Sequence, residues 1–69
     1  MKKRYTLVGV DGNAFSIMGY VRNAMKACNK TKSEIDAYTN DAMSSNYPHL
    51  ICVSNDMIDK LNEELSNEE

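Results

Sequence analysis

The sequence predicts a small α+β domain that is mostly helical, with one strand at about residues 4–10 followed by three helices at about 13–28, 33–44 and 47–65. Three observations support this fold. The chain has 69 residues, which suits a single domain over residues 1–69. It opens with a β-branched and aromatic run. The remainder carries apolar residues at the three- and four-residue spacing that is typical of amphipathic helices.

The strand is predicted from the run RYTLVGV, which ends at the turn-forming residues Asp11, Gly12 and Asn13. Backbone N–H and C=O groups need partners, and the chain offers no obvious second strand. We therefore expect a two-fold homodimer in which residues 6–10 of the two subunits pair antiparallel. The strand residues of this expected interface are Tyr5, Thr6, Leu7, Val8 and Val10.

The first helix is indicated by the clearest periodicity in the chain. Its apolar residues fall on one stripe of a helix and comprise Ala14, Ile17, Met18, Val21, Ala24, Met25 and Cys28. Arg22 and Lys26 lie on the opposite, polar side. This division between faces predicts a helix that packs one side against a core.

The second helix is expected to begin at Ser33, because a serine side chain can accept a hydrogen bond from a free N–H group of the first turn. Its apolar face is narrow and consists of Ile35, Tyr38 and Ala42. A helix this short and polar needs tertiary contacts to be stable.

Residues 47–65 are predicted to form one long helix, because most of their apolar side chains fall on one side of a helical wheel. Pro48 suits the first turn of such a helix. The alternative is a second strand at 49–54 that pairs with the first strand. Residues 66–69 are expected to form a frayed acidic tail.

Charge is divided unevenly along the chain. The formal net charge is −2, yet residues 1–32 carry seven cations and one acid, whereas residues 33–69 carry one cation and nine acids. One interpretation is that the basic half packs beside the acidic half, within one chain or across a dimer. The other is that the basic half meets an anionic partner. This alternative predicts a nucleic-acid-binding regulator that uses Lys2, Lys3, Arg4, Arg22, Lys26 and Lys30.

Neither a cofactor nor a metal site is predicted. Cys28 and Cys52 do not have zinc-ligand spacing, and Asp11-Gly12-Asn13 lacks the other ligands of a calcium loop. A thiol or hydrolytic enzyme built on Cys52 and His49 is the least favoured hypothesis, since no third group is evident to orient the imidazole. With no secretory or membrane-spanning pattern, we expect a non-enzymatic cytoplasmic protein with free thiols.

The candidate surface for a protein partner is the corner between the predicted strand and the first helix. Aromatic side chains anchor many protein interfaces, which draws attention to Phe15 and Tyr47. The full predicted set is Asp11, Gly12, Asn13, Phe15, Tyr47 and His49.

Four segments of the chain carry a resemblance. They are residues 7–15 (LVGVDGNAF), 17–19 (IMG), 34–38 (EIDAY) and 47–50 (YPHL). Together they resemble a group of short proteins without an assigned activity that are encoded by gut bacteria, their phages and other mobile elements. The resemblance implies a bacterial or phage setting and a small accessory factor that binds a host or phage macromolecule.

Overall fold

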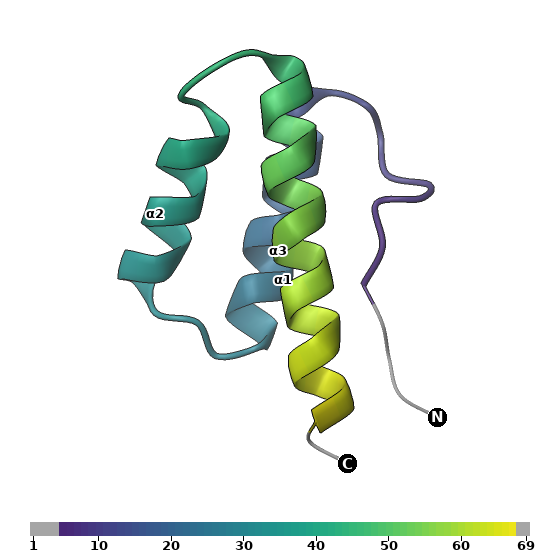
Figure 1. Ribbon diagram of the computed structural model, residues 1–69, viewed down its shortest axis with the longest axis vertical. Coiled ribbons are helices and arrows are strands. Elements are labelled where there is room, and N and C mark those ends of the chain that lie inside the picture. Colours follow the sequence, from purple (N-terminus) through teal and green to yellow (C-terminus); the bar gives the residue numbers. More distant parts are fainter. Residues whose placement is uncertain (1–4, 68–69) are drawn as a thin grey trace.

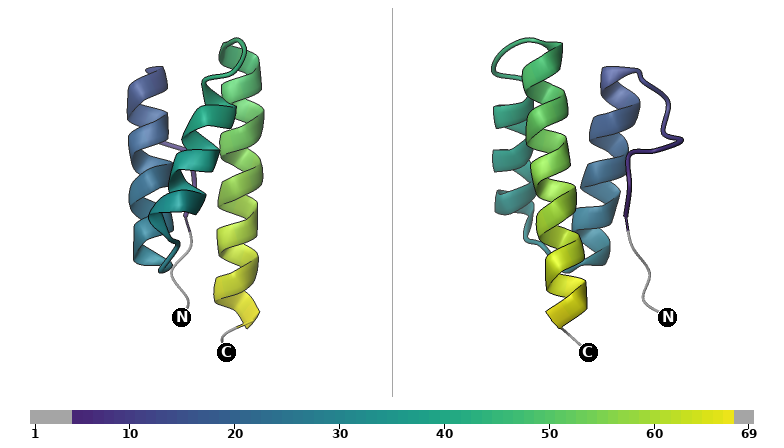
Figure 2. Two further views of the ribbon diagram at one scale, coloured as in Figure 1. Left: turned by 90° about the vertical axis from the view of Figure 1, so that its left-hand side faces the viewer. Right: turned by 45° about the vertical axis from the view of Figure 1, so that its right-hand side comes forward.

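The computed structural model describes residues 5–67, which contain three helices: α1 (Ala14–Ala27), α2 (Lys32–Ala42) and α3 (Tyr47–Asn67). α1 and α3 run in the same direction, and α2 runs antiparallel to both (Figure 1). α2 lies on one side of the α1–α3 pair, and residues 5–12 lie on the other side (Figure 2). We call residues 5–12 the N-terminal strap.

The three helices share one apolar core. Its buried residues are Ile17, Met18, Val21, Ala24, Met25, Ile35, Tyr38, Ala42, Leu50, Ile58 and Leu61. The narrow face predicted for α2 is confirmed in full, and the α1 stripe is confirmed with Ala14 and Cys28 half-buried at its two ends. Val21 and Leu61 have no exposed surface and lie at the centre of the core.

α3 begins at Tyr47 as predicted, and the other five helix boundaries differ from the predicted ones by one or two residues. α2 begins at Lys32 rather than Ser33 because Thr31 caps it: Glu34 N–H donates to Thr31 Oγ1 over 3.2 Å, and Thr31 N–H donates to a Glu34 carboxylate oxygen over 2.9 Å. α3 is capped by Asn46, whose side-chain oxygen accepts from His49 N–H at 3.1 Å.

α1 ends in a tight turn that reverses the chain. Asn29 takes the left-handed conformation, with φ of 65°, and its N–H donates to the Lys26 carbonyl over 3.0 Å. The next N–H, that of Lys30, donates to the Met25 carbonyl, also over 3.0 Å. This pair of bonds is the Schellman arrangement, which satisfies the last carbonyls of a helix. It places Lys30 and the start of α2 directly beside the end of α1.

The predicted strand at residues 4–10 is wrong for the residues that the structure describes, because residues 5–10 form no strand. Side chains take the place of a neighbouring strand. Tyr5 N–H donates to Asn62 Oδ1 over 2.8 Å, and Asn62 Nδ2 donates to the Tyr5 carbonyl over 2.9 Å. Thr6 N–H donates to the Tyr20 hydroxyl over 2.9 Å. The Tyr5 N–H and C=O groups and the Thr6 N–H group thus find their partners within the same chain.

A tight turn also bends the strap away from a strand. Val10 N–H donates to the Leu7 carbonyl over 3.1 Å, and Gly9 adopts φ of 85°, which glycine tolerates at the third position of a type II turn. The turn leaves Val8 86% exposed, while Leu7 and Val10 pack against the core together with Tyr5. The expected dimer interface over residues 6–10 therefore loses the strand on which it was based.

In the C-terminal half of the chain, α3 covers all or part of two segments for which the sequence offered another structure, a strand at 49–54 and a tail at 66–69. The alternative strand at 49–54 is wrong, because these residues lie within α3. α3 also continues to Asn67, two residues beyond its predicted end, so the first two positions of the predicted tail at 66–69 belong to this helix. Its last two positions lie outside the described residues, as do Lys2, Lys3 and Arg4.

One polar pair is buried inside the core. Ser54 has no exposed surface, and its hydroxyl lies 2.6 Å from the hydroxyl of Tyr38, which is 4% exposed. Burial raises the pKa of Tyr38 above its usual range, and the hydrogen bond with Ser54 opposes this effect. The pair joins α2 to α3, and each hydroxyl satisfies the other where water is excluded.

We expect Asn62→Ala to release the beginning of the strap. The substitution removes both bonds to the Tyr5 backbone, which should destabilise the protein by about 1–2 kcal/mol. Hydrogen exchange at the Tyr5 amide should accelerate strongly. Asn55→Ala, at an exposed position of the same helix, is the control and should leave that amide unchanged. Equal exchange rates in both variants would contradict the role given to Asn62.

We expect Ser54→Ala to cost about 1–3 kcal/mol of unfolding free energy, because it leaves the buried Tyr38 hydroxyl without its partner. Adding Tyr38→Phe removes that orphaned group. The double variant should therefore be less destabilised than the sum of the two single variants. Urea unfolding followed by circular dichroism measures all three. Strictly additive values would show that the hydroxyls are not coupled.

Candidate functional site

A hollow lies at the end of the bundle where the start of α1, the end of α2 and the start of α3 come together. Its volume is about 260 Å³. We call the residues around it the apolar end surface, which consists of Phe15, Met43 and Tyr47 around a floor of Met18, Ala42 and Leu50. The floor belongs to the core, so the hollow is an opening onto the core itself.

The rim of this surface is unusual because its large apolar side chains are open to solvent. Phe15 is 75% exposed, Met43 is 59% exposed and Tyr47 is 47% exposed. Within residues 5–67 the only other large apolar side chain with comparable exposure is that of Val8, which does not line the hollow. Exposed apolar side chains scattered singly are normal in proteins, whereas several gathered at one hollow indicate an interaction site.

The predicted corner residues hold this surface in shape. The Asp11 carboxylate accepts from Asn13 N–H at 3.2 Å, and Asn13 Oδ1 accepts from Phe15 N–H at 2.8 Å, which caps α1. The Tyr47 hydroxyl donates to the Gly12 carbonyl over 2.5 Å. Asp11 and Asn13 therefore position the backbone that presents Phe15, and Tyr47 ties the strap to the start of α3.

His49 departs from the predicted surface. Its Nε2 atom lies 3.0 Å from the Asp41 carbonyl, 3.2 Å from Asp41 Oδ1 and 3.4 Å from Ser44 Oγ. The ring thus contacts the end of α2 and does not line the hollow. A catalytic triad needs the serine and the aspartate on opposite nitrogens of the imidazole, whereas here both are near the same nitrogen.

The remaining candidates for chemistry are the two cysteines. Cys28 is a half-buried free thiol, and Cys52 is an exposed one. No hydrogen bond joins Cys52 to His49 within residues 5–67. Over the same residues, no three His, Cys, Asp or Glu side chains gather in a way that would hold a metal ion. None of the described helices is both long and apolar enough to span a membrane.

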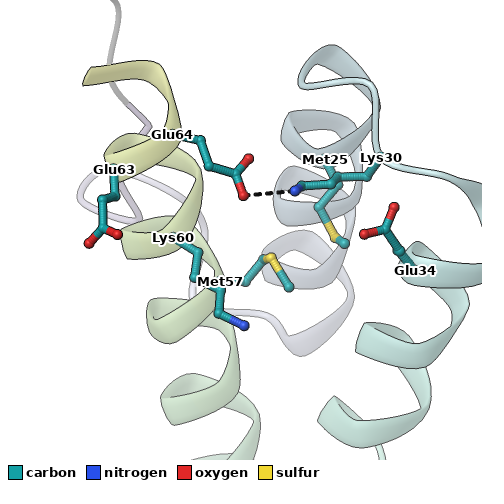
Figure 3. Close-up of a pocket in the computed structure, with 7 residues that line it drawn as sticks. All are labelled: Met25, Lys30, Glu34, Met57, Lys60, Glu63 and Glu64. Atoms are coloured by element: carbon teal, nitrogen blue, oxygen red, sulfur yellow. Dashed lines mark hydrogen bonds and ion pairs between the residues drawn. The ribbon is translucent and has the colours of Figure 1, made fainter. Parts of the chain in front are cut away.

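A larger hollow of about 410 Å³ lies between the second half of α3 and the turn from α1 to α2 (Figure 3). Met25 and Met57 form its base, and charged side chains of both signs surround it. Lys30 Nζ and Glu64 Oε2 are 2.8 Å apart, and this hydrogen bond raises the pKa of Lys30. Because its charges compensate one another, we interpret this hollow as the structural junction between α3 and the α1–α2 turn.

The structure adds Met43 to the site, a residue that the sequence pattern did not single out. Met43 follows the last residue of α2, so it belongs to no helical stripe. The sequence offered one signal, which is that Met43 is a large apolar residue that lies on none of the apolar faces of the predicted helices. A large apolar residue just after a helix stays exposed unless a neighbouring element covers it.

Comparisons of the chain with protein-family models, with curated proteins and with solved structures gave no match. The resemblance to short proteins of gut bacteria and their phages stays a prediction.

Proposed function

We propose that this chain is a small non-enzymatic accessory protein that acts by binding another protein through its apolar end surface. The observation that carries the proposal is the gathering of Phe15, Met43 and Tyr47 at one hollow, each of them about half exposed or more. A partner that inserts an apolar side chain there would contact both the rim and the core beneath it.

The residue types at the rim support a protein partner. Aromatic side chains and methionine are enriched at protein interfaces, where a few such anchors supply most of the binding energy. Methionine also adapts its shape to different partners. Fully burying a phenylalanine side chain contributes about 1.5–3 kcal/mol, and Phe15 is still 75% exposed, so most of that gain is open to a partner.

The proposal places the protein in the cytoplasm of a bacterial cell or of a phage-infected host. The resemblance of residues 7–15 and 47–50 to proteins of bacteria and phages supports this setting. The two free cysteines are compatible with a reducing compartment.

The proposal also includes a homodimer, formed through the apolar end surface rather than through a strand, so a partner protein must displace the second copy to reach Phe15. Phe15 protrudes beside the hollow, so two copies related by a two-fold axis would each present one Phe15 and one hollow to the other. Such an interface is self-complementary, as two-fold dimers require. Small domains also gain stability from association, because a single small hydrophobic core contributes little to the free energy of folding.

The partner surface can be tested by replacing Phe15 with the photo-crosslinking residue benzoylphenylalanine. We expect cross-links to one defined protein in a bacterial lysate, or to a second copy in the purified protein. The matched control places the same residue at Val8, which is more exposed but lies outside the hollow. Equal cross-linking from both positions would contradict a specific surface.

The homodimer can be tested by light scattering coupled to gel filtration at about 100 µM protein. We expect twice the 7.8 kDa mass of the chain, and Phe15→Ala should weaken the dimer about tenfold or more, since that substitution removes the largest exposed anchor. Val8→Ala should not change the mass. A clean monomer in the unsubstituted protein would contradict the dimer.

A further inference from the structure

The cations of the described chain gather at one place. Five lysine and arginine residues lie within residues 5–67, and four of them, Arg22, Lys26, Lys30 and Lys32, line one hollow of about 340 Å³. Ile35 and Asp36 complete its lining. We call this site the basic hollow. Its lining carries four cations and one carboxylate on a protein whose formal net charge is −2.

Local structure produces this concentration. Arg22 and Lys26 are four residues apart on α1, so they stand on adjacent turns about 6 Å apart along the helix axis. The Schellman turn at Asn29 then reverses the chain, and the cap at Thr31 starts α2 immediately afterwards. Lys30 and Lys32 are thereby brought to the same side of the molecule as the two α1 cations.

Two of the four cations have carboxylate partners, and two do not. Lys30 pairs with Glu64, and Lys32 pairs with Asp36 in a solvent-exposed contact of 2.9 Å, which holds its ammonium only weakly. Arg22 and Lys26 form no ion pair with any residue between 5 and 67.

The arrangement of Arg22 and Lys26 is unfavourable for the helix by itself. Like charges four residues apart on a helix repel each other and destabilise it slightly. A bound anion would remove this repulsion. The hollow therefore combines two uncompensated cations with a third that is weakly held, and these are the groups that attract phosphates.

We propose that the basic hollow binds the phosphates of a nucleic-acid duplex backbone. The cations extend along α1 and onto α2, which suits successive phosphates better than one compact anion. No aromatic side chain lines the hollow, so stacking of unpaired bases is not favoured there. Binding through phosphates alone is independent of base sequence and weakens steeply with salt. The second half of α1 and the first half of α2 line this site, whereas the start of α1 and the end of α2 line the apolar end surface. The two sites share no residue, so the basic hollow is independent of the proposed protein binding.

The test uses fluorescence anisotropy of a labelled 20-base-pair DNA duplex with the full chain, from roughly 20 to 150 mM salt. We expect weak binding that falls with salt. The double variant Arg22→Ala, Lys26→Ala should bind at least about tenfold more weakly at low salt, and its log–log salt slope should be smaller by about 1.8, or roughly 0.9 for each lost phosphate contact. Both positions are exposed, so circular dichroism should report an intact fold.

The matched control is Lys60→Ala, which removes the one described cation outside the basic hollow. It should leave the affinity and the salt slope nearly unchanged. An equal loss of affinity in Lys60→Ala would mean that the net charge of the protein, and not the basic hollow, governs binding. That result would overturn the proposal. The proposal would also be overturned if the protein did not bind the duplex at low salt, or if it bound inorganic pyrophosphate but not the duplex. Binding of polyglutamate as tightly as the duplex would overturn it as well.

Discussion

The structure depends on the mutual burial of three apolar stripes, none of which is wide enough to stabilise a helix alone. α2 has 11 residues and only three buried side chains, so it exists because α1 and α3 cover Ile35, Tyr38 and Ala42. Val21 and Leu61 are fully buried where α1 and α3 meet. Because this core fixes the helix ends, it also fixes the places where the strap, the apolar end surface and the basic hollow are formed.

The strap shows a second way to satisfy the hydrogen bonds of an extended segment. A side-chain amide offers both a donor group and an acceptor, as the backbone of a strand residue does, and Asn62 uses both on Tyr5. Tyr20 continues this role with its hydroxyl on Thr6, and its ring meets Tyr5 edge to face at a centroid distance of 6.3 Å. A polar residue at the edge of a helical stripe can therefore act as the partner of a backbone segment distant in sequence.

The helices could be predicted from the sequence because their periodicity is local, and the strap could not. The core contains the residues of α1 and α2 that were expected to be buried, apart from the half-buried Ala14 and Cys28, and the long α3 was preferred over a strand on the same grounds. The run at residues 4–10 has the composition of a strand, and its true partners, Tyr20 and Asn62, are 14 and 57 residues away from the residues they bind. Only tertiary structure brings them together.

The candidate surface was predicted only in part, because some of its residues stand out in the local sequence and others are brought there by tertiary structure. Phe15 and Tyr47 stand out as aromatic residues near helix starts, and the structure places both at the hollow. His49 shares that segment with Tyr47, but helix geometry turns its ring towards Asp41. Met43 lies inside the predicted helix at 33–44 but off its apolar face, and the structure places it just after the last residue of α2.

The bond between Tyr5 and Asn62 has a practical consequence for handling the protein. It holds the beginning of the described chain against the second half of α3, so both described ends lie away from the pole at which α1 and α3 begin (Figure 1). An affinity tag or a sensor-chip linker attached at either end would therefore orient the molecule with its aromatic pole facing outward.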